Sequence, residues 1–221
     1  MVLEFVSSGS GAISSWSHTN AGVPQGSILG PLLFLIFIND IVININSNIR
    51  LFADDTSLFL IVEDPTESAQ QLQEDIYAIS AWADDWKVSF NSSKTISVIF
   101  SRKQNRPYHP QLSLSNDLIS QEDCHKHLGL ILSSDCSWHL HLKYIIEKAW
   151  LRVNVMRKLK FQLNKSALEQ TYFAFVRPIL EYADVIWNNC TAYEKSELDK
   201  IQNEAARIVS GTTRLLHRRP L

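Results

Sequence analysis

The pattern of hydrophobic and polar residues changes along the chain. Near its start, the run PLLFLIFI begins at Pro31 and is apolar without interruption. It predicts a helix from about residue 28 to 41 that is buried on most sides. Residues 1–20 before it predict a short extended segment with a Ser/Gly-rich turn. The next apolar segment, RLFADDTSLFLIV, is divided by a polar pair and predicts two strands joined by a turn that carries Asp54 and Asp55.

Helical spacing replaces this pattern after residue 63. Asp64 is a suitable N-cap, Pro65 occupies the first helical position and Glu67 lies three residues after the cap. The apolar residues that follow recur at helical spacing: Leu72, Ile76, Ile79, Ala83 and Trp86. This segment predicts a long amphipathic helix over about residues 65–88.

Short strands are predicted next. The segments TISVIFS (95–101) and HLGLIL (127–132) each predict a strand. Between them, LSLSNDLIS predicts a small hairpin around Asn116 and Asp117.

Only helices are predicted from about residue 134 onward. The first carries one apolar stripe: Trp138, Leu142, Ile145, Ala149, Val153, Met156 and Leu159. The second begins at Asn164 and must kink or restart at Pro178. The third is opened by Thr191 with Glu194 as a capping box and ends near Gly211.

These elements predict an α+β fold in two domains. A mixed layer spans residues 1–133, a helical domain spans 134–211, and a basic, frayed tail spans 212–221. Residues 1–100 contain three Lys or Arg against 11 Asp or Glu, whereas residues 101–221 contain 18 against 12. A basic half beside an acidic half suits a polyanionic partner and a cation site, although such charge blocks are often only solvated faces.

Composition narrows the class of protein. The chain has 221 residues, of which 45% are hydrophobic, enough for one large core or two modest domains. The three cysteines have no regular framework, so we expect a reducing compartment and no disulfide: Cys124, Cys136 and Cys190. The start MVLEFVSSGSG lacks the features of a signal peptide, and the longest apolar run is too short to span a bilayer. We therefore expect an intracellular protein, nuclear or cytoplasmic, with no membrane partner.

The adjacent aspartates of LFADDTSLFL need an explanation. Two neighbouring carboxylates within an apolar run combine the cost of desolvation with like-charge repulsion. Either Asp54 and Asp55 lie at a solvated turn, where aspartate is common, or a cation is held between them.

Two motifs about 30 residues apart, GVPQGSILGPLLF and FADDT, resemble those of the reverse transcriptases of non-LTR (LINE-type) retrotransposons. The resemblance continues in the same order through WADDWKVSFNSSKTISVIF, HLGLILSSDCSWHLH and RPILEYADVIWNNCTAYEKSELDKIQNEAARIVSGTTR. It implies an RNA-directed DNA polymerase, a nucleotidyltransferase, with a partial palm of antiparallel hairpins and packed helices followed by a thumb-like helical domain. The implied partners are an RNA template, a DNA primer and deoxynucleoside triphosphates.

The resemblance also implies roles for individual residues. Asp54 would be the principal ligand of Mg²⁺, or alternatively Mn²⁺, and Asp55 its neighbour in a two-metal site. Lys94 matches the lysine that protonates the departing pyrophosphate. The incoming nucleotide and template base would contact the loop formed by Pro24, Gln25, Gly26 and Ser27. The primer would contact Leu128, Gly129, Lys143 and Arg152, and other helical cations would bind duplex phosphates without reading sequence: Lys148, Arg157, Lys158 and Lys160.

Zinc is a competing interpretation for one segment. CHKHLGLILSSDCSWHLH contains sulfur and imidazole ligands, although their spacing matches no familiar zinc finger: Cys124, His125, His127, Cys136, His139 and His141.

One part of the family pattern is missing. The family's third metal-binding carboxylate lies on a strand upstream of GVPQGS, but the only acid among the first 21 residues is Glu4. We therefore expect the C-terminal portion of a polymerase, inactive by itself. The alternative is a non-catalytic nucleic-acid-binding remnant of a retroelement.

Overall fold

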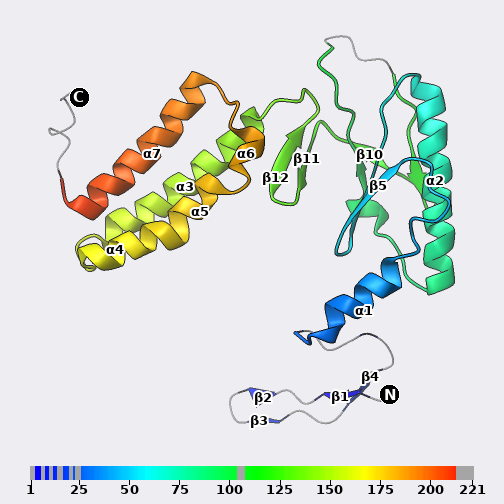
Figure 1. Cartoon of the computed structure of the whole chain (residues 1–221), viewed down its shortest axis with the longest axis horizontal. Helices are drawn as coiled ribbons and strands as arrows, with labels where there is room; N and C mark the ends of the chain where they lie inside the picture. The colour runs from blue at the N-terminus through cyan, green and yellow to red at the C-terminus, as the bar shows by residue number, and fades with distance from the viewer. Residues whose placement is uncertain are drawn as a thin grey trace. The chain divides into compact units, whose positions relative to one another are not determined.

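The computed structural model describes residues 3–5, 8–9, 12–13, 17–19, 22, 26–103 and 108–212 (Figure 1). It divides the chain into two compact units. The first unit comprises residues 1–95 and 107–119, and the second unit comprises residues 96–106 and 120–221. No helix among the described residues is long and apolar enough to cross a membrane.

The first unit is built from antiparallel strand pairs and two long helices. Its elements in chain order are β1 (Leu3–Phe5), β2 (Ser8–Gly9), β3 (Ala12–Ile13), β4 (Ser17–Thr19), α1 (Leu29–Ile38), β5 (Asn48–Phe52), β6 (Asp55–Phe59), α2 (Pro65–Trp86), the 3₁₀ turn η1 (Ser92–Lys94), β8 (Ser113–Leu114) and β9 (Asp117–Leu118). The antiparallel pairs are β1 with β4, β2 with β3, β5 with β6 and β8 with β9.

Helix α2 forms where its caps and apolar stripe predict. The Asp64 side chain accepts hydrogen bonds from the backbone N–H groups of Thr66 and Glu67, and Pro65 begins the helix. Its buried face packs against the β5–β6 hairpin and α1 in one apolar cluster around Ile38, Ile41 and Ile79. The predicted hairpin at residues 113–118 is also confirmed, with Ser115 and Asn116 in the left-handed region of its turn.

The second unit places two small strand pairs before a helical domain. Its elements are β7 (Ile96–Ser97), β10 (Ser120–Gln121), β11 (Cys124–His127), β12 (Leu130–Ser133), α3 (His139–Leu159), α4 (Lys165–Thr171), the π-helical turn η2 (Tyr172–Val176), α5 (Arg177–Glu181), α6 (Asp184–Trp187) and α7 (Ala192–Ser210). Strands β7 and β10 are parallel, whereas β11 and β12 form an antiparallel hairpin.

The helices of the second unit surround a continuous apolar core. Helix α3 buries its stripe against α5, η2 and α7, with Ala149 and Val153 fully enclosed (Figure 1). The predicted break before Pro178 takes the form of the π-helical turn η2. Both halves of the capping box between Thr191 and Glu194 are present, and Gly211 closes α7 with φ of 70°.

Three predictions about these elements were wrong. Helix α1 is shorter than expected. Its residues Leu35 and Ile36 are 62% and 65% exposed. Within the described residues, only the side of the helix that carries Phe34, Phe37 and Ile38 packs on the unit. An apolar run gives no information about what covers its other side.

The position predicted for Trp86 in the helix is confirmed: it is the last residue of α2, where it is 46% exposed and lies edge-on to Phe37. Only Ile96–Ser97 of the segment 95–101 is a strand. The segment 127–132 is not one strand but contains a turn, since Leu128 and Gly129 both adopt positive φ. The short helix α6 was not predicted.

Candidate active site

The two adjacent aspartates lie at the exposed end of the β5–β6 hairpin. Phe52 pairs with Asp55 across the strands, leaving Ala53 and Asp54 as the two-residue turn. Ala53 has φ of 50°, a conformation that costs free energy for a residue with a Cβ. Both Asp54 and Asp55 are exposed. The hairpin predicted from the sequence is confirmed.

The hairpin is fixed to its unit by apolar contacts and by a buried acid. Ile49, Leu51 and Leu58 pack into the cluster formed with α1 and α2. Asp75 of α2 is fully buried and accepts hydrogen bonds from the backbone N–H groups of Asn46 and Ser47, both at 2.8 Å, and from the Ser47 hydroxyl. Because Asn46 and Ser47 directly precede β5, Asp75 holds the start of the strand that leads to Asp54.

The donor set at the hairpin turn fits a hard cation. Carboxylate oxygens are preferred ligands of Mg²⁺, which keeps several waters and so needs few protein ligands. Asp54 and Asp55 supply such oxygens at an open turn. Among the described residues, no group of three His, Cys, Asp or Glu side chains is arranged to hold a metal ion. The described part of the site therefore provides two ligands of suitable chemistry.

The predicted nucleotide-binding loop is described only in part. Pro24 and Gln25 lie outside the described residues. Gly26 is exposed with φ of 81°, a conformation that glycine adopts without strain. The Ser27 hydroxyl accepts a hydrogen bond from the Gly30 N–H at 3.1 Å, so this serine satisfies one backbone N–H group in the first turn of α1.

The predicted lysine lies on a capped 3₁₀ turn of the same unit. Lys94 ends η1, where its backbone N–H donates to the Asn91 side chain at 3.2 Å. Its side chain is exposed. The fold thus presents an ammonium group to solvent from a capped turn.

The predicted primer-binding residues belong to the second unit. Leu128 and Gly129 form the exposed turn of the β11–β12 hairpin, and Lys143 and Arg152 are exposed on α3. The other predicted phosphate-binding side chains are also exposed: Lys148, Arg157, Lys158 and Lys160. Arg157 pairs with Glu204 at 2.8 Å, so one of these charges is partly neutralised.

Two of the proposed zinc ligands, His139 and His141, make other contacts through their Nδ1 atoms. His141 is buried between Trp138 and Trp187, and its Nδ1 accepts a hydrogen bond from the Ile131 N–H at 3.3 Å. Burial, assisted by the charge of Lys126, lowers the pKa of His141 and keeps the ring neutral. Its place is in the core, so zinc binding by this set finds no support among the described residues.

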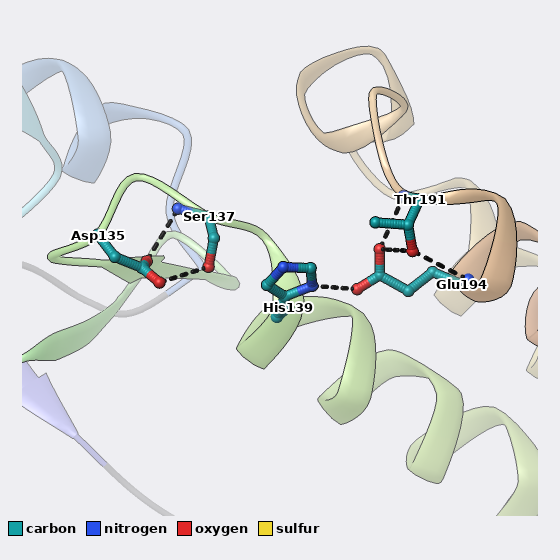
Figure 2. Close-up of polar contacts among 5 residues, drawn as sticks. All are labelled: Asp135, Ser137, His139, Thr191 and Glu194. Carbon is teal, nitrogen blue, oxygen red and sulfur yellow. Dashed lines mark hydrogen bonds and ion pairs between the residues drawn. The ribbon is translucent and has the colours of Figure 1, made fainter. Parts of the chain in front are cut away.

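His139 takes part in a polar cluster that joins the starts of α3 and α7 (Figure 2). Its Nδ1 lies 2.6 Å from Glu194, which also accepts hydrogen bonds from the Thr191 N–H and hydroxyl. The hydrogen bond to Glu194, followed by its charge, raises the pKa of His139. Burial by itself raises the pKa of Glu194, but hydrogen bonds from Thr191 and His139 outweigh it and lower that pKa.

The loop before α3 is stabilised in a similar way. Asp135 accepts hydrogen bonds from the Ser137 N–H at 2.9 Å and from the Ser137 hydroxyl at 3.0 Å (Figure 2). Hydrogen bonds from the Ser137 backbone, and then from the Ser133 and Ser137 hydroxyls, lower the pKa of Asp135 to about 2. The charged carboxylate thus fixes the entry to α3.

Three hydrogen bonds that help to position the candidate site residues could not be predicted from the sequence. They are the Asp75 anchor before β5, the hydrogen bond from Trp82 Nε1 to Asp40 at 2.7 Å, and that from the Tyr182 hydroxyl to the Leu128 carbonyl at 2.6 Å. Each joins residues far apart in the chain, so only the folded arrangement reveals them.

Comparison with known proteins identifies the family. Residues 3–132 match the family described as "Reverse transcriptase (RNA-dependent DNA polymerase)". The chain is 29% identical over 210 residues to the "Probable RNA-directed DNA polymerase from transposon X-element" of Drosophila melanogaster, covering 90% of this chain and 23% of that protein. It is 30% identical over 216 residues to the corresponding protein of transposon BS from the same organism, covering 90% and 24%.

A third relative is the "RNA-directed DNA polymerase from mobile element jockey" of Drosophila funebris, 29% identical over 215 residues, covering 91% of this chain and 23% of that protein. The chain thus spans only about a quarter of the length of these curated relatives. No solved structure is significantly similar to it. The resemblance seen in its motifs is confirmed: the chain belongs to the reverse transcriptase (RNA-dependent DNA polymerase) family and is similar to the members encoded by non-LTR retrotransposons.

Proposed function

We propose that this chain is the part of an RNA-directed DNA polymerase that carries the metal-binding hairpin of the palm and the helices of a thumb. Its substrates are an RNA template, a DNA primer and deoxynucleoside triphosphates. The observation that carries the proposal is the position of Asp54 and Asp55, exposed at one hairpin turn inside the segment that matches the family.

Asp54 and Asp55 would hold Mg²⁺, with Mn²⁺ as an alternative. When bound there, the metal supplies positive charge to the reacting 3′-oxygen and the transferred phosphate. The chain's own contribution is positioning, because the packed hairpin keeps both carboxylates at one open point. Lys94 would donate a proton to the departing pyrophosphate. The loop from Pro24 to Ser27 would contact the incoming nucleotide and its template base.

The second unit would bind the primer–template duplex. The Leu128–Gly129 turn contacts the end of the primer, and exposed cations of α3, among them Lys143 and Arg152, bind backbone phosphates. In this arrangement the palm ends near residue 133 and the thumb spans residues 134–211.

Metal binding by the hairpin can be tested with Mn²⁺. Amide NMR signals near bound Mn²⁺ broaden, so titrating the chain should broaden the signals of residues 52–57 first. Asp54→Asn combined with Asp55→Asn should abolish this broadening. The chain contains a matched control, because the same Ala-Asp-Asp sequence recurs at residues 83–85 on α2, where both aspartates are exposed. Asp84→Asn with Asp85→Asn should leave the broadening at the hairpin unchanged.

Duplex binding tests the role of the second unit. The affinity for an RNA–DNA duplex should fall steeply as salt rises and should not depend on sequence. Lys143→Ala should lower the slope of log affinity against log salt by about 0.9, the value of one phosphate contact. The chain could bind the duplex without any Mn²⁺-dependent broadening of the amide signals at the hairpin. This result would favour the other candidate function, a non-catalytic nucleic-acid-binding protein.

A further inference from the structure

One tyrosine holds the turn of the β11–β12 hairpin from outside. The Tyr182 hydroxyl donates a hydrogen bond of 2.6 Å to the Leu128 carbonyl, 54 residues earlier in the chain. Tyr182 immediately follows α5, and its side chain is half exposed. The contact therefore lies at the surface of the second unit and not in its core.

The turn that it holds has an unfavourable backbone conformation. Leu128 has φ of 46° and Gly129 has φ of 86°. Positive φ is common for glycine but unusual for leucine, whose Cβ crowds the backbone there. Such conformations persist where surrounding contacts impose them. The Tyr182 hydrogen bond ends on the carbonyl of the strained residue itself, so it is one such contact.

The tyrosine ring also occupies the space beside Gly129. A Cβ added at Gly129 would lie 3.1 Å from Tyr182 Cε1 and 3.5 Å from Cζ. A side chain at position 129 would thus be strained by the positive φ and crowded by the ring. The turn and the ring form one fitted contact on the exposed face of the hairpin.

Tyr182 is in turn fixed to the core of the second unit. Its carbonyl accepts a hydrogen bond of 3.0 Å from Trp187 Nε1, and Trp187 is buried against Leu142 and Ile145. Ala183, with φ of 52°, lies between the tyrosine and α6 and is the N-cap residue of that helix. A path of direct contacts therefore runs from the helical core through Trp187 and Tyr182 to the hairpin turn.

We propose that Tyr182 is a positioning residue for the primer terminus. It fixes the exposed backbone of Leu128 and Gly129 in the one conformation that receives the primer end. This inference rests on the proposed function, which places the primer at that turn. Because the hydroxyl acts on the turn and not on the duplex phosphates, it affects recognition of a primer end more than affinity for a duplex.

The test compares two ligands with the full chain. One is an RNA template with a recessed DNA primer, and the other is a fully paired RNA–DNA duplex of the same paired length that is closed by a loop at each end and so has no free primer end. The ratio of their dissociation constants measures the preference for a primer end. Tyr182→Phe keeps the ring and removes the hydrogen bond, so this preference should fall about fivefold, as expected for one hydrogen bond.

The affinity of Tyr182→Phe for the fully paired duplex should stay near that of the unchanged chain, and its thermal midpoint should fall by no more than about 2–4 °C, as expected for the loss of one hydrogen bond. Gly129→Ala, which crowds the ring and strains a residue with φ of 86°, should also lower the preference. Tyr193→Phe is the matched control, since Tyr193 is exposed on α7 of the same unit, and it should change neither ligand's affinity.

The outcomes separate this inference from the proposed function. A clear preference for the recessed primer that Tyr182→Phe leaves intact overturns the role of Tyr182 alone. Equal weakening of both ligands by Tyr182→Phe also overturns it, since the tyrosine would then be a general duplex contact. An unchanged chain without any preference for a primer end contradicts the primer site in the proposed function, and the role of Tyr182 with it.

Discussion

Replacing Asp75 with alanine would remove the anchor of the strand that leads to Asp54. The Asp75 side chain is 0% exposed and accepts hydrogen bonds from Asn46 N–H, Ser47 N–H and the Ser47 hydroxyl. Ser47 is itself buried, so in the variant its N–H would have neither this acceptor nor free access to water. A buried donor left without a partner costs about 1–3 kcal/mol, and more than one donor is affected.

We therefore expect Asp75→Ala to lower the free energy of unfolding of the first unit by about 3 kcal/mol. This is a large part of the roughly 5–15 kcal/mol that stabilises an ordinary domain. Amide hydrogen exchange over residues 46–59 measures the effect, and 3 kcal/mol corresponds to exchange about 100-fold faster.

Asp84→Ala provides the control, because Asp84 is exposed on the same helix, and it should change stability by less than about 0.5 kcal/mol. If Asp75→Ala accelerates exchange no more than Asp84→Ala does, the three hydrogen bonds do not hold the start of β5. The structural reason given for the position of Asp54 would then be wrong.

Three further predictions concern the second unit. Thr191→Ala removes the N-cap of α7 and should lower the free energy of unfolding by about 1 kcal/mol in urea denaturation. Folding raises the pKa of His139, so the stability that His139 gives the folded chain is complete below its unfolded pKa and is lost as pH rises through its folded pKa. Folding lowers the pKa of Glu194, so the stability that Glu194 gives is lost as pH falls through its folded pKa. The difference in thermal midpoint between the unchanged chain and His139→Ala should therefore be largest at about pH 5–6.5 and shrink on both sides. Leu142→Ala, at a side chain 0% exposed, should cost about 2–5 kcal/mol in denaturation, whereas Leu140→Ala at an exposed position of α3 should cost far less.

The sequence predicts the elements whose signals are local. Helices α2 and α7 begin where Asp64 and Thr191 can satisfy free backbone N–H groups, and their apolar stripes identify the buried faces. The β5–β6 turn is predictable because a polar pair interrupts an apolar run. These features depend on residues within one or two turns of each other, which is the range over which a sequence pattern carries information.

The structural features that could not be predicted from the sequence depend on residues far away in the chain. Asp75 occupies an ordinary polar position in a helical pattern, and only the loop 29 residues earlier makes it a buried anchor. Leu128 has no local feature that predicts positive φ, so the sequence around Gly129 predicts a continuous strand where the structure has a turn. The exposure of Leu35 was missed for the same reason, since apolarity does not reveal which neighbours are present.

The most direct measurement of the proposed polymerase role is primer extension on an RNA template by a chimaera of the jockey polymerase of Drosophila funebris. In it, residues 22–132 of this chain replace the matching segment of that relative. We expect the chimaera to extend the primer with Mg²⁺, and Asp54→Asn to slow extension by about 100-fold or more, because several kcal/mol of charge stabilisation depends on the metal site. Asp84→Asn should leave the rate unchanged. A folded chimaera that extends nothing, or an Asp54→Asn chimaera that extends at the unchanged rate, would contradict the assignment of the hairpin as the metal-binding site.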